Sequence, residues 1–149
     1  MDTYNSKYYE PLEQMMAIRH QYMSKILRDH SGQDIYEFFK NKKILDLGCG
    51  TGEFLNNYYG MGAECSGIDI ENNFKIKNKI NFKLINIEAN KFLKNCKKKF
   101  DVIFLFEFLE HLEEQDKYQL FENLTKNLNK NAYIFISTLN KNVLSKYLA

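Results

Sequence analysis

The apolar residues of this chain follow two spacings that alternate along the sequence. Between residues 12 and 27 they recur every three or four positions, the period of a helix that buries one face. Later segments of four to six mostly apolar residues, bounded by glycine or charged residues, predict short strands. Helices are predicted at residues 12–27, 35–39, 52–59, 89–96 and 116–128, with another beginning within 142–149. Strands are predicted at residues 44–47, 63–68, 82–87, 101–106 and 132–137.

Strands that alternate with helices through short connections are typical of parallel strands joined by right-handed crossovers. The predicted fold class is therefore α/β: a Rossmann-like, doubly wound, mainly parallel sheet of five strands with helices on both faces. The strand at residues 101–106 is apolar at nearly every position, as expected for a strand covered on both sides. We expect one domain, in which residues 1–40 form a short helical segment and residues 42–141 form the core.

Composition and charge remove several classes of protein from consideration. The chain has 149 residues, of which 44% are hydrophobic, and 21 basic against 19 acidic residues give a net charge of +2. A charge so close to balance does not favour a nucleic-acid partner. The longest apolar run, residues 102–106, is too short to cross a bilayer, and no secretory leader is recognisable, so a cytoplasmic location is expected. The three cysteines have no metal-binding spacing and are expected to be reduced thiols.

The candidate chemistry begins in the segment Asp46-Leu47-Gly48-Cys49-Gly50-Thr51-Gly52, after the first predicted strand. Its glycines allow a sharp turn and a close approach of ligand to backbone, and the next helix presents unpaired N–H groups. The GxGxG spacing favours a ligand without a phosphate, and Asp46 suits the amino group of a methionine moiety. Asp69, at the end of the second strand, is placed to accept hydrogen bonds from two ribose hydroxyls. An NAD-dependent oxidoreductase is the less favoured alternative.

The segments ILDLGCGTGEF and GIDI resemble the first two motifs of class I S-adenosylmethionine-dependent methyltransferases, and the resemblance extends over about residues 42–141. It implies S-adenosylmethionine as the cofactor, with its ribose on Asp69 and its adenine beside residues 86–88. The candidate cofactor-binding residues are Arg19, Asp46, Gly48, Gly50, Gly52, Asp69, Glu88 and Phe106.

Three further segments resemble the O-methyltransferases of ubiquinone biosynthesis. Arg19 matches an arginine that contacts the cofactor in that subfamily, although the histidine and asparagine that accompany it there are Glu13 and Met16 here. Residues 137–141, STLNK, resemble the STLNR segment that follows the fifth strand. Residues 107–111, EFLEH, resemble an E-x-x-E-H motif that binds a divalent metal in characterised relatives.

The E-x-x-E-H segment has three competing interpretations. Glu107, Glu110 and His111 could hold a magnesium ion that binds a catechol and lowers the pKa of the attacked phenol. His111 could instead act as the catalytic general base. The three residues could also have a purely structural role where a helix begins. The sequence leaves these alternatives open.

The subfamily resemblance implies methylation of a small phenolic or quinone-precursor substrate, by direct transfer from the sulfonium. A lipophilic substrate of this kind would bring the protein into peripheral contact with a membrane, without an integral membrane segment. The family fold adds a C-terminal antiparallel hairpin that is missing from these 149 residues, which would leave the fifth strand at an edge. A homodimer is one expected way to cover that edge. The alternative function is a cofactor-binding or interaction module without catalysis.

Overall fold

The computed structural model describes residues 10–73 and 82–138, and the chain divides into two compact units, residues 1–40 and 41–149. The helix expected within residues 142–149 lies outside the described residues. No helix in the described part of the chain is long and apolar enough to span a membrane. Whether the two units act as one domain stays a prediction.

The N-terminal unit contains α1 (Glu10–Ser31) and α2 (Ile35–Phe39). α1 continues one turn beyond its predicted end and stops at Gly32, whose φ of +67° leaves the helical region. The N–H of Gly32 donates to the carbonyl of Arg28 at 3.0 Å, which satisfies a carbonyl in the last turn of the helix. Asp34 caps α2 by accepting a hydrogen bond from the N–H of Tyr36 at 2.8 Å.

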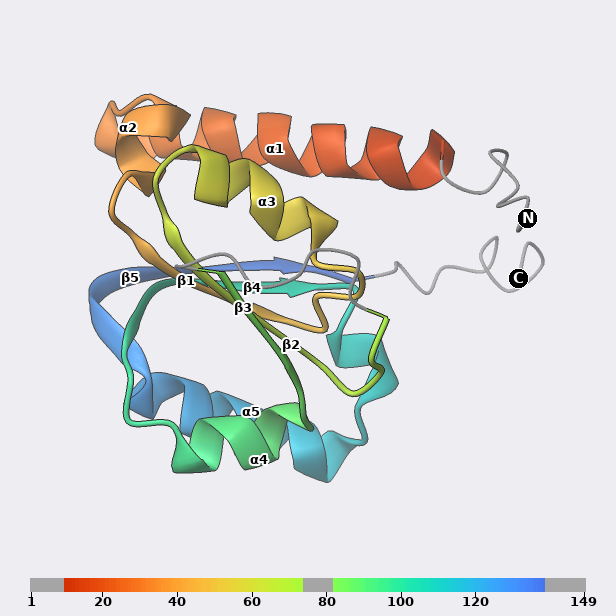
Figure 1. Ribbon diagram of the computed structural model, residues 1–149. Coiled ribbons are helices and arrows are strands. Elements are labelled where there is room, and N and C mark those ends of the chain that lie inside the picture. The colour runs from red at the N-terminus through yellow and green to blue at the C-terminus, as the bar shows by residue number, and fades with distance from the viewer. Residues whose placement is uncertain (1–9, 74–81, 139–149) are drawn as a thin grey trace. The chain divides into compact units, whose positions relative to one another are not determined.

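The second unit is built on a parallel five-stranded sheet in the order β3-β2-β1-β4-β5. The strands are β1 (Lys43–Leu47), β2 (Glu64–Asp69), β3 (Phe82–Asn86), β4 (Phe100–Phe106) and β5 (Leu128–Ser137). The helix α3 (Glu53–Gly60) covers one face, and α4 (Ala89–Asn95) and α5 (Glu114–Lys126) cover the other (Figure 1). The predicted doubly wound α/β fold is confirmed. The strand order reverses between β1 and β4, and folds of this class bind their ligands at such a reversal.

Both faces of the central strands are buried, which explains their nearly continuous apolar sequences. Leu45 and Leu105 belong to a fully buried cluster with side chains of α4 and α5. On the other face, Phe104 lies 5.6 Å from Phe54 and 5.2 Å from Tyr58 between ring centroids, and both of these residues belong to α3. The sheet is therefore held between two apolar layers.

β5 begins four residues earlier than the sequence predicts. Leu128 already pairs with Phe100, and the ladder then breaks at a bulge where Asn131 has a φ of +63°. Asn127, which is buried, donates hydrogen bonds to the carbonyls of Cys96 and Lys98 at 2.9 and 3.0 Å. The early start of β5 thus depends on contacts between distant segments. In the described sheet, β3 and β5 are the outer strands.

Candidate cofactor-binding site

A pocket of about 440 Å³ lies at the carboxyl edge of the sheet, and its walls come from the segments that follow β1, β2, β3 and β4. This size falls within the range of small-molecule sites. The lining residues are Gly48, Ile68, Asp69, Ile70, Glu71, Ile87, Glu88, Ala89, Glu107, Phe108, His111 and Leu112. The pocket occupies the position at which an open α/β sheet binds its ligand.

The glycine-rich turn after β1 lies against the end of β2. The N–H groups of Gly48 and Cys49 both donate to the carbonyl of Ile68, at 2.8 and 3.0 Å. Gly48 has a φ of +76°, and a Cβ placed on it would lie only 2.7 Å from Cδ2 of Phe108. Both observations explain why glycine is needed there: the backbone conformation is left-handed and the neighbouring ring leaves no room.

Asp69 joins the two sequence motifs that predicted the site. Its Oδ2 accepts a hydrogen bond from the N–H of Gly50, and its Oδ1 accepts one from the N–H of Glu71, both at 2.8 Å. The carboxylate therefore points toward the glycine turn and lies on the pocket wall. Each oxygen retains a lone pair that can accept a further hydrogen bond, such as one from a ribose hydroxyl.

The side chain of Asn86, the last residue of β3, secures the neighbouring end of β2. Its Nδ2 donates to the carbonyls of Asp69 and Ile70 at 3.1 and 2.8 Å. The end of β3 was expected beside adenine, and Ile87 and Glu88 do lie on the pocket wall. The two carboxylate oxygens of Glu88 accept from the N–H groups of Asn90 and Lys91 at 2.7 and 2.8 Å, so Glu88 also caps α4.

Asp46 is buried, with 4% of its surface exposed, and lies outside the pocket wall. Its contact with the methionine amino group stays a prediction. Burial, followed by the charge of Asp46, raises the pKa of Cys65 to about 12. The same two causes, in the same order, raise the pKa values of Cys49 and Tyr58. Cys49 is therefore a neutral thiol at physiological pH, which suits packing and disfavours nucleophilic chemistry.

The pocket wall is acidic. Asp69, Glu71, Glu88 and Glu107 contribute carboxylates, His111 is the one basic side chain on it, and no lysine or arginine lies on the described wall. A wall of this charge attracts a cationic ligand and repels a phosphate. The structure thus supports the electrostatic argument that favoured a sulfonium cofactor over a dinucleotide.

The E-x-x-E-H segment continues from β4 into the 3-10 helix η2 (Leu109–His111). Glu107 adopts a left-handed φ of +50°, an uncommon conformation for a non-glycine residue and one found more often at functional sites. Its N–H donates to the carbonyl of Ser137 at 2.8 Å, which ties the segment to the end of β5. Glu107 and His111 reach the pocket wall, and the imidazole of His111 is exposed.

The residues of the metal site implied by the resemblance are not grouped together in the described part of the chain. Within the described residues, no three His, Cys, Asp or Glu side chains are grouped to hold a metal ion. Glu110 lies off the pocket wall, and its carboxylate oxygens are buried with no hydrogen-bond partner in the part of the chain that the structure describes. Successive residues of a 3-10 helix are rotated by about 120°, so Glu110 and His111 cannot face the same way. The described arrangement does not support Glu107, Glu110 and His111 as one ligand set, which stays a prediction.

Three other candidates of the second unit do not line the pocket. Phe106 packs in the apolar layer, with ring centroids 5.0 Å from Phe104 and 5.3 Å from Phe54. Gly50 contributes through its N–H to Asp69, and Gly52, with a φ of +81°, precedes α3. Arg19 belongs to α1 in the N-terminal unit, so its contact with the cofactor stays a prediction.

Sequence reasoning assigned no binding role to six residues of the pocket wall: Ile68, Ile70, Glu71, Ala89, Phe108 and Leu112. The sequence gives only a weak indication for Glu71, which is that the residue follows Asp69, the ribose-binding candidate, by two positions. Phe108 is hidden between the two glutamates of the E-x-x-E-H motif. Its contact with the glycine turn depends on the adjacency of β1 and β4, which the local sequence does not encode.

Comparison with known proteins places the chain in a defined class. The chain belongs to the methyltransferase domain family, whose model matches residues 15–148. A ubiquinone biosynthesis O-methyltransferase of Pelagibacter ubique is 34% identical over 95% of this chain and 60% of that protein. Its counterpart in Colwellia psychrerythraea is 30% identical with the same coverage. This chain thus spans about 60% of the length of these two relatives.

Solved structures agree with this class. An S-adenosylmethionine-dependent methyltransferase from Archaeoglobus fulgidus is 26% identical, with a TM-score of 0.62 over 90% of this chain and 59% of that one. The plantazolicin methyltransferase BamL, solved with S-adenosylhomocysteine, shares the fold at a TM-score of 0.71 and 23% identity, over 96% of this chain and 53% of that one. The predicted family is confirmed, and these relatives support S-adenosylmethionine, not magnesium, as the cofactor.

Proposed function

We propose that the pocket at the carboxyl edge binds S-adenosylmethionine and that the chain transfers its methyl group to the oxygen of a small phenolic or quinone-precursor substrate. One observation carries the proposal: the carboxylate of Asp69 accepts a hydrogen bond from the N–H of Gly50, 2.8 Å away. The ribose-binding candidate and the glycine turn therefore form a single ligand-binding surface. The names of the relatives support ubiquinone biosynthesis as the context.

Different residues of the pocket have different roles in this proposal. Asp69 orients the ribose through its remaining lone pairs, and the bare backbone at Gly48 lets the ligand approach closely. Bound S-adenosylmethionine supplies an electrophilic methyl group, which the acceptor oxygen takes while the electrons of the broken carbon–sulfur bond stay on sulfur. The acidic wall favours a cationic ligand. The pocket contributes mainly proximity and orientation, as expected for a direct displacement.

His111 is the candidate to accept the phenolic proton. Its imidazole is exposed on the pocket wall, where an acceptor could approach it. A positioned general base contributes a factor of about 10² to 10⁴ to the rate. Deprotonation by His111 does not require the metal site, which the described residues do not form. Peripheral membrane contact, a cytoplasmic location and a homodimer remain further proposals.

Two measurements test the function together. S-adenosylhomocysteine is titrated into the protein in a calorimeter, and transfer of a labelled methyl group to a catechol acceptor is followed separately. His111→Gln should lower turnover by about 10² to 10⁴ and leave the dissociation constant of S-adenosylhomocysteine within about twofold. His30→Gln, on an exposed position of α1, is the matched control and should change neither.

The outcomes separate the alternatives. Absence of S-adenosylhomocysteine binding would refute the function as a whole. Binding without turnover on any phenolic acceptor would instead favour a cofactor-binding module. Full turnover by His111→Gln would show that another group takes the proton.

A further inference from the structure

In the described part of the chain, Phe108 supplies the only phenyl ring on the pocket wall. The ring packs against the buried cluster that contains Leu45, Leu105 and apolar side chains of α4 and α5. One edge of the ring also lies against the glycine turn, where a Cβ on Gly48 would be 2.7 Å from Cδ2 and 3.5 Å from Cγ and Cε2. The ring is therefore held between the core and the glycine turn, and it borders the cavity.

The backbone on either side of Phe108 fixes this position. Glu107 has a left-handed φ of +50°, which costs free energy in a non-glycine residue, and its N–H donates to the carbonyl of Ser137 at 2.8 Å. The carbonyl of Phe108 accepts a hydrogen bond from the N–H of His111 at 3.2 Å, across the 3-10 turn η2. A strained residue and a tight turn thus flank the ring that contacts Gly48.

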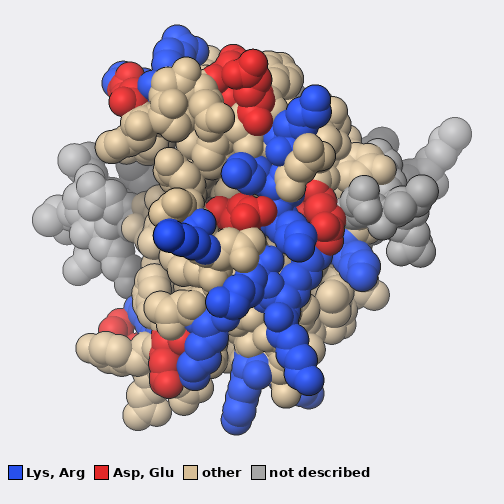
Figure 2. All heavy atoms as spheres, turned by 90° about the vertical axis from the view of Figure 1, so that its left-hand side faces the viewer, with Lys and Arg blue, Asp and Glu red and all other residues tan. Residues whose placement is uncertain are grey.

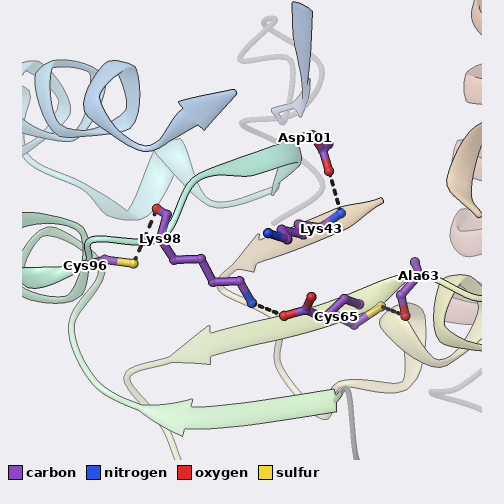
Figure 3. A network of polar contacts seen from close by, with 7 residues as sticks. Lys43, Ala63, Cys65, Cys96, Lys98 and Asp101 are labelled. Carbon is purple, nitrogen blue, oxygen red and sulfur yellow. Dashed lines mark hydrogen bonds and ion pairs between the residues drawn. The ribbon is translucent and has the colours of Figure 1, made fainter. Parts of the chain in front are cut away.

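Positive side chains are concentrated at the edge of the sheet opposite the pocket. All five strands are parallel, so the residues at their starts share this edge, and Figure 2 shows many basic side chains there around a few carboxylates. The lysines at or next to the strand starts are Lys42, Lys43, Lys83, Lys97, Lys98, Lys99 and Lys130. Lys98 forms an ion pair with Glu64 (Figure 3), and this hydrogen bond holds the pKa of Glu64 below its usual value. The described pocket wall has no lysine or arginine, so a cationic ligand meets no such competitor there.

A phenyl ring on an acidic wall is suited to a cation that cannot donate a hydrogen bond. The sulfonium of S-adenosylmethionine is such a cation, because its sulfur carries three carbon substituents and no hydrogen. The face of an aromatic ring attracts a cation of this kind through its quadrupole, as it does quaternary ammonium groups. The sulfur of S-adenosylhomocysteine is neutral and lacks this attraction. A ring beside the sulfur can therefore distinguish the cofactor from its product.

We propose that Phe108 is a specificity-determining residue whose ring packs against the sulfonium. The inference rests on the proposed function, in which Asp69 holds the ribose and His111 accepts the proton of the acceptor. Phe108 adjoins both of these residues: it contacts the glycine turn, to which Asp69 is bonded through the N–H of Gly50, and its carbonyl is bonded to the N–H of His111. The ring thus favours binding of the charged cofactor and release of the neutral product.

Calorimetric titration with three ligands, in the absence of an acceptor, tests the proposal. S-adenosylmethionine carries the sulfonium, and S-adenosylhomocysteine carries a neutral sulfur. Sinefungin has an amine-bearing carbon in place of the sulfonium, so it is a cation without the S-methyl group. Phe108→Leu keeps an apolar side chain but removes the ring, and it should raise the dissociation constants of the two cations about threefold to thirtyfold. The value for S-adenosylhomocysteine should stay within about twofold.

Two further variants separate the ring from its packing. Phe108→Tyr keeps an aromatic face, so the dissociation constants of both cations should stay within about twofold of those of the unaltered protein. Phe92→Leu is the matched control, because Phe92 is a half-buried ring of α4 that packs against the same cluster but does not line the pocket. It should change all three dissociation constants by less than about twofold. Melting temperatures check that each variant is folded.

The outcomes separate this proposal from the proposed function. Equal losses of affinity for the cations and for S-adenosylhomocysteine in Phe108→Leu would overturn the proposal and assign the ring to packing alone. A loss for S-adenosylmethionine without one for sinefungin would also overturn it, because the ring would then contact the methyl group and not the charge. Failure of the unaltered protein to bind any of the three ligands would instead refute the proposed function, and this inference with it.

Discussion

Replacement of Asp69 by asparagine is the sharpest test of the cofactor site. The substitution keeps the size of the side chain but removes its charge and replaces one carboxylate oxygen by an NH₂ group. Both oxygens now accept a backbone hydrogen bond, from Gly50 and from Glu71, each at 2.8 Å. An NH₂ group in either position would face a backbone N–H, so the variant loses one of these contacts as well as an acceptor for the ribose.

The expected effect follows from the value of hydrogen bonds to charged groups, about 1.5–3 kcal/mol each. Loss of one ribose contact and partial loosening of the turn should together weaken binding of S-adenosylhomocysteine by about 2–4 kcal/mol. This corresponds to an increase of roughly 30-fold to 1,000-fold in the dissociation constant. Isothermal titration calorimetry of Asp69→Asn against the unaltered protein measures it directly, and unfolding without ligand separates loss of binding from loss of stability.

Asp101→Asn supplies the matched control. Asp101 also accepts two hydrogen bonds at 2.8 Å, one from the backbone N–H of Lys43 and one from Asn129, but at the opposite edge of the sheet. Its replacement should leave the dissociation constant within about twofold. Should Asp69→Asn bind the ligand as tightly as the unaltered protein, or should Asp101→Asn weaken binding equally, the ribose-binding role of Asp69 is wrong.

Three further substitutions test the turn, the cap and the core. Gly48→Ala places a Cβ 2.7 Å from Phe108 at a φ of +76°, so it should lower the melting temperature and weaken cofactor binding. Gly60→Ala, with no atom within 4 Å of the new Cβ, should do neither. Glu88→Gln should reduce the free energy of unfolding, measured in urea, by about 1 kcal/mol because it weakens the cap of α4. A loss of cofactor affinity greater than about tenfold would show that Glu88 also contacts the cofactor. Phe104→Ala removes a fully buried ring and should lower the free energy of unfolding by about 3–5 kcal/mol, whereas a loss below about 1 kcal/mol would contradict the packing described.

The sequence by itself determined the fold class and predicted the two segments of the candidate cofactor site. α4 and β4 were predicted within one residue of their observed bounds, because the burial of one or both faces determines the local spacing of apolar residues. The glycine turn and Asp69 were likewise found from the sequence. The residues of each of these motifs are close together in the sequence, at the end of one strand, so the motif can be recognised from the local sequence alone.

The tertiary structure decided the features that depend on which strands lie side by side. β5 begins at Leu128 because Asn127 bonds to carbonyls from a distant segment, which no local pattern reveals. Phe108 reaches the glycine turn only because β4 pairs with β1, and the turn of η2 separates Glu110 from His111 although they adjoin in sequence. The lysines at the starts of the strands lie at one edge of the sheet for the same reason, because parallel pairing brings together residues that are far apart in the sequence. The net charge of +2 does not reveal this grouping.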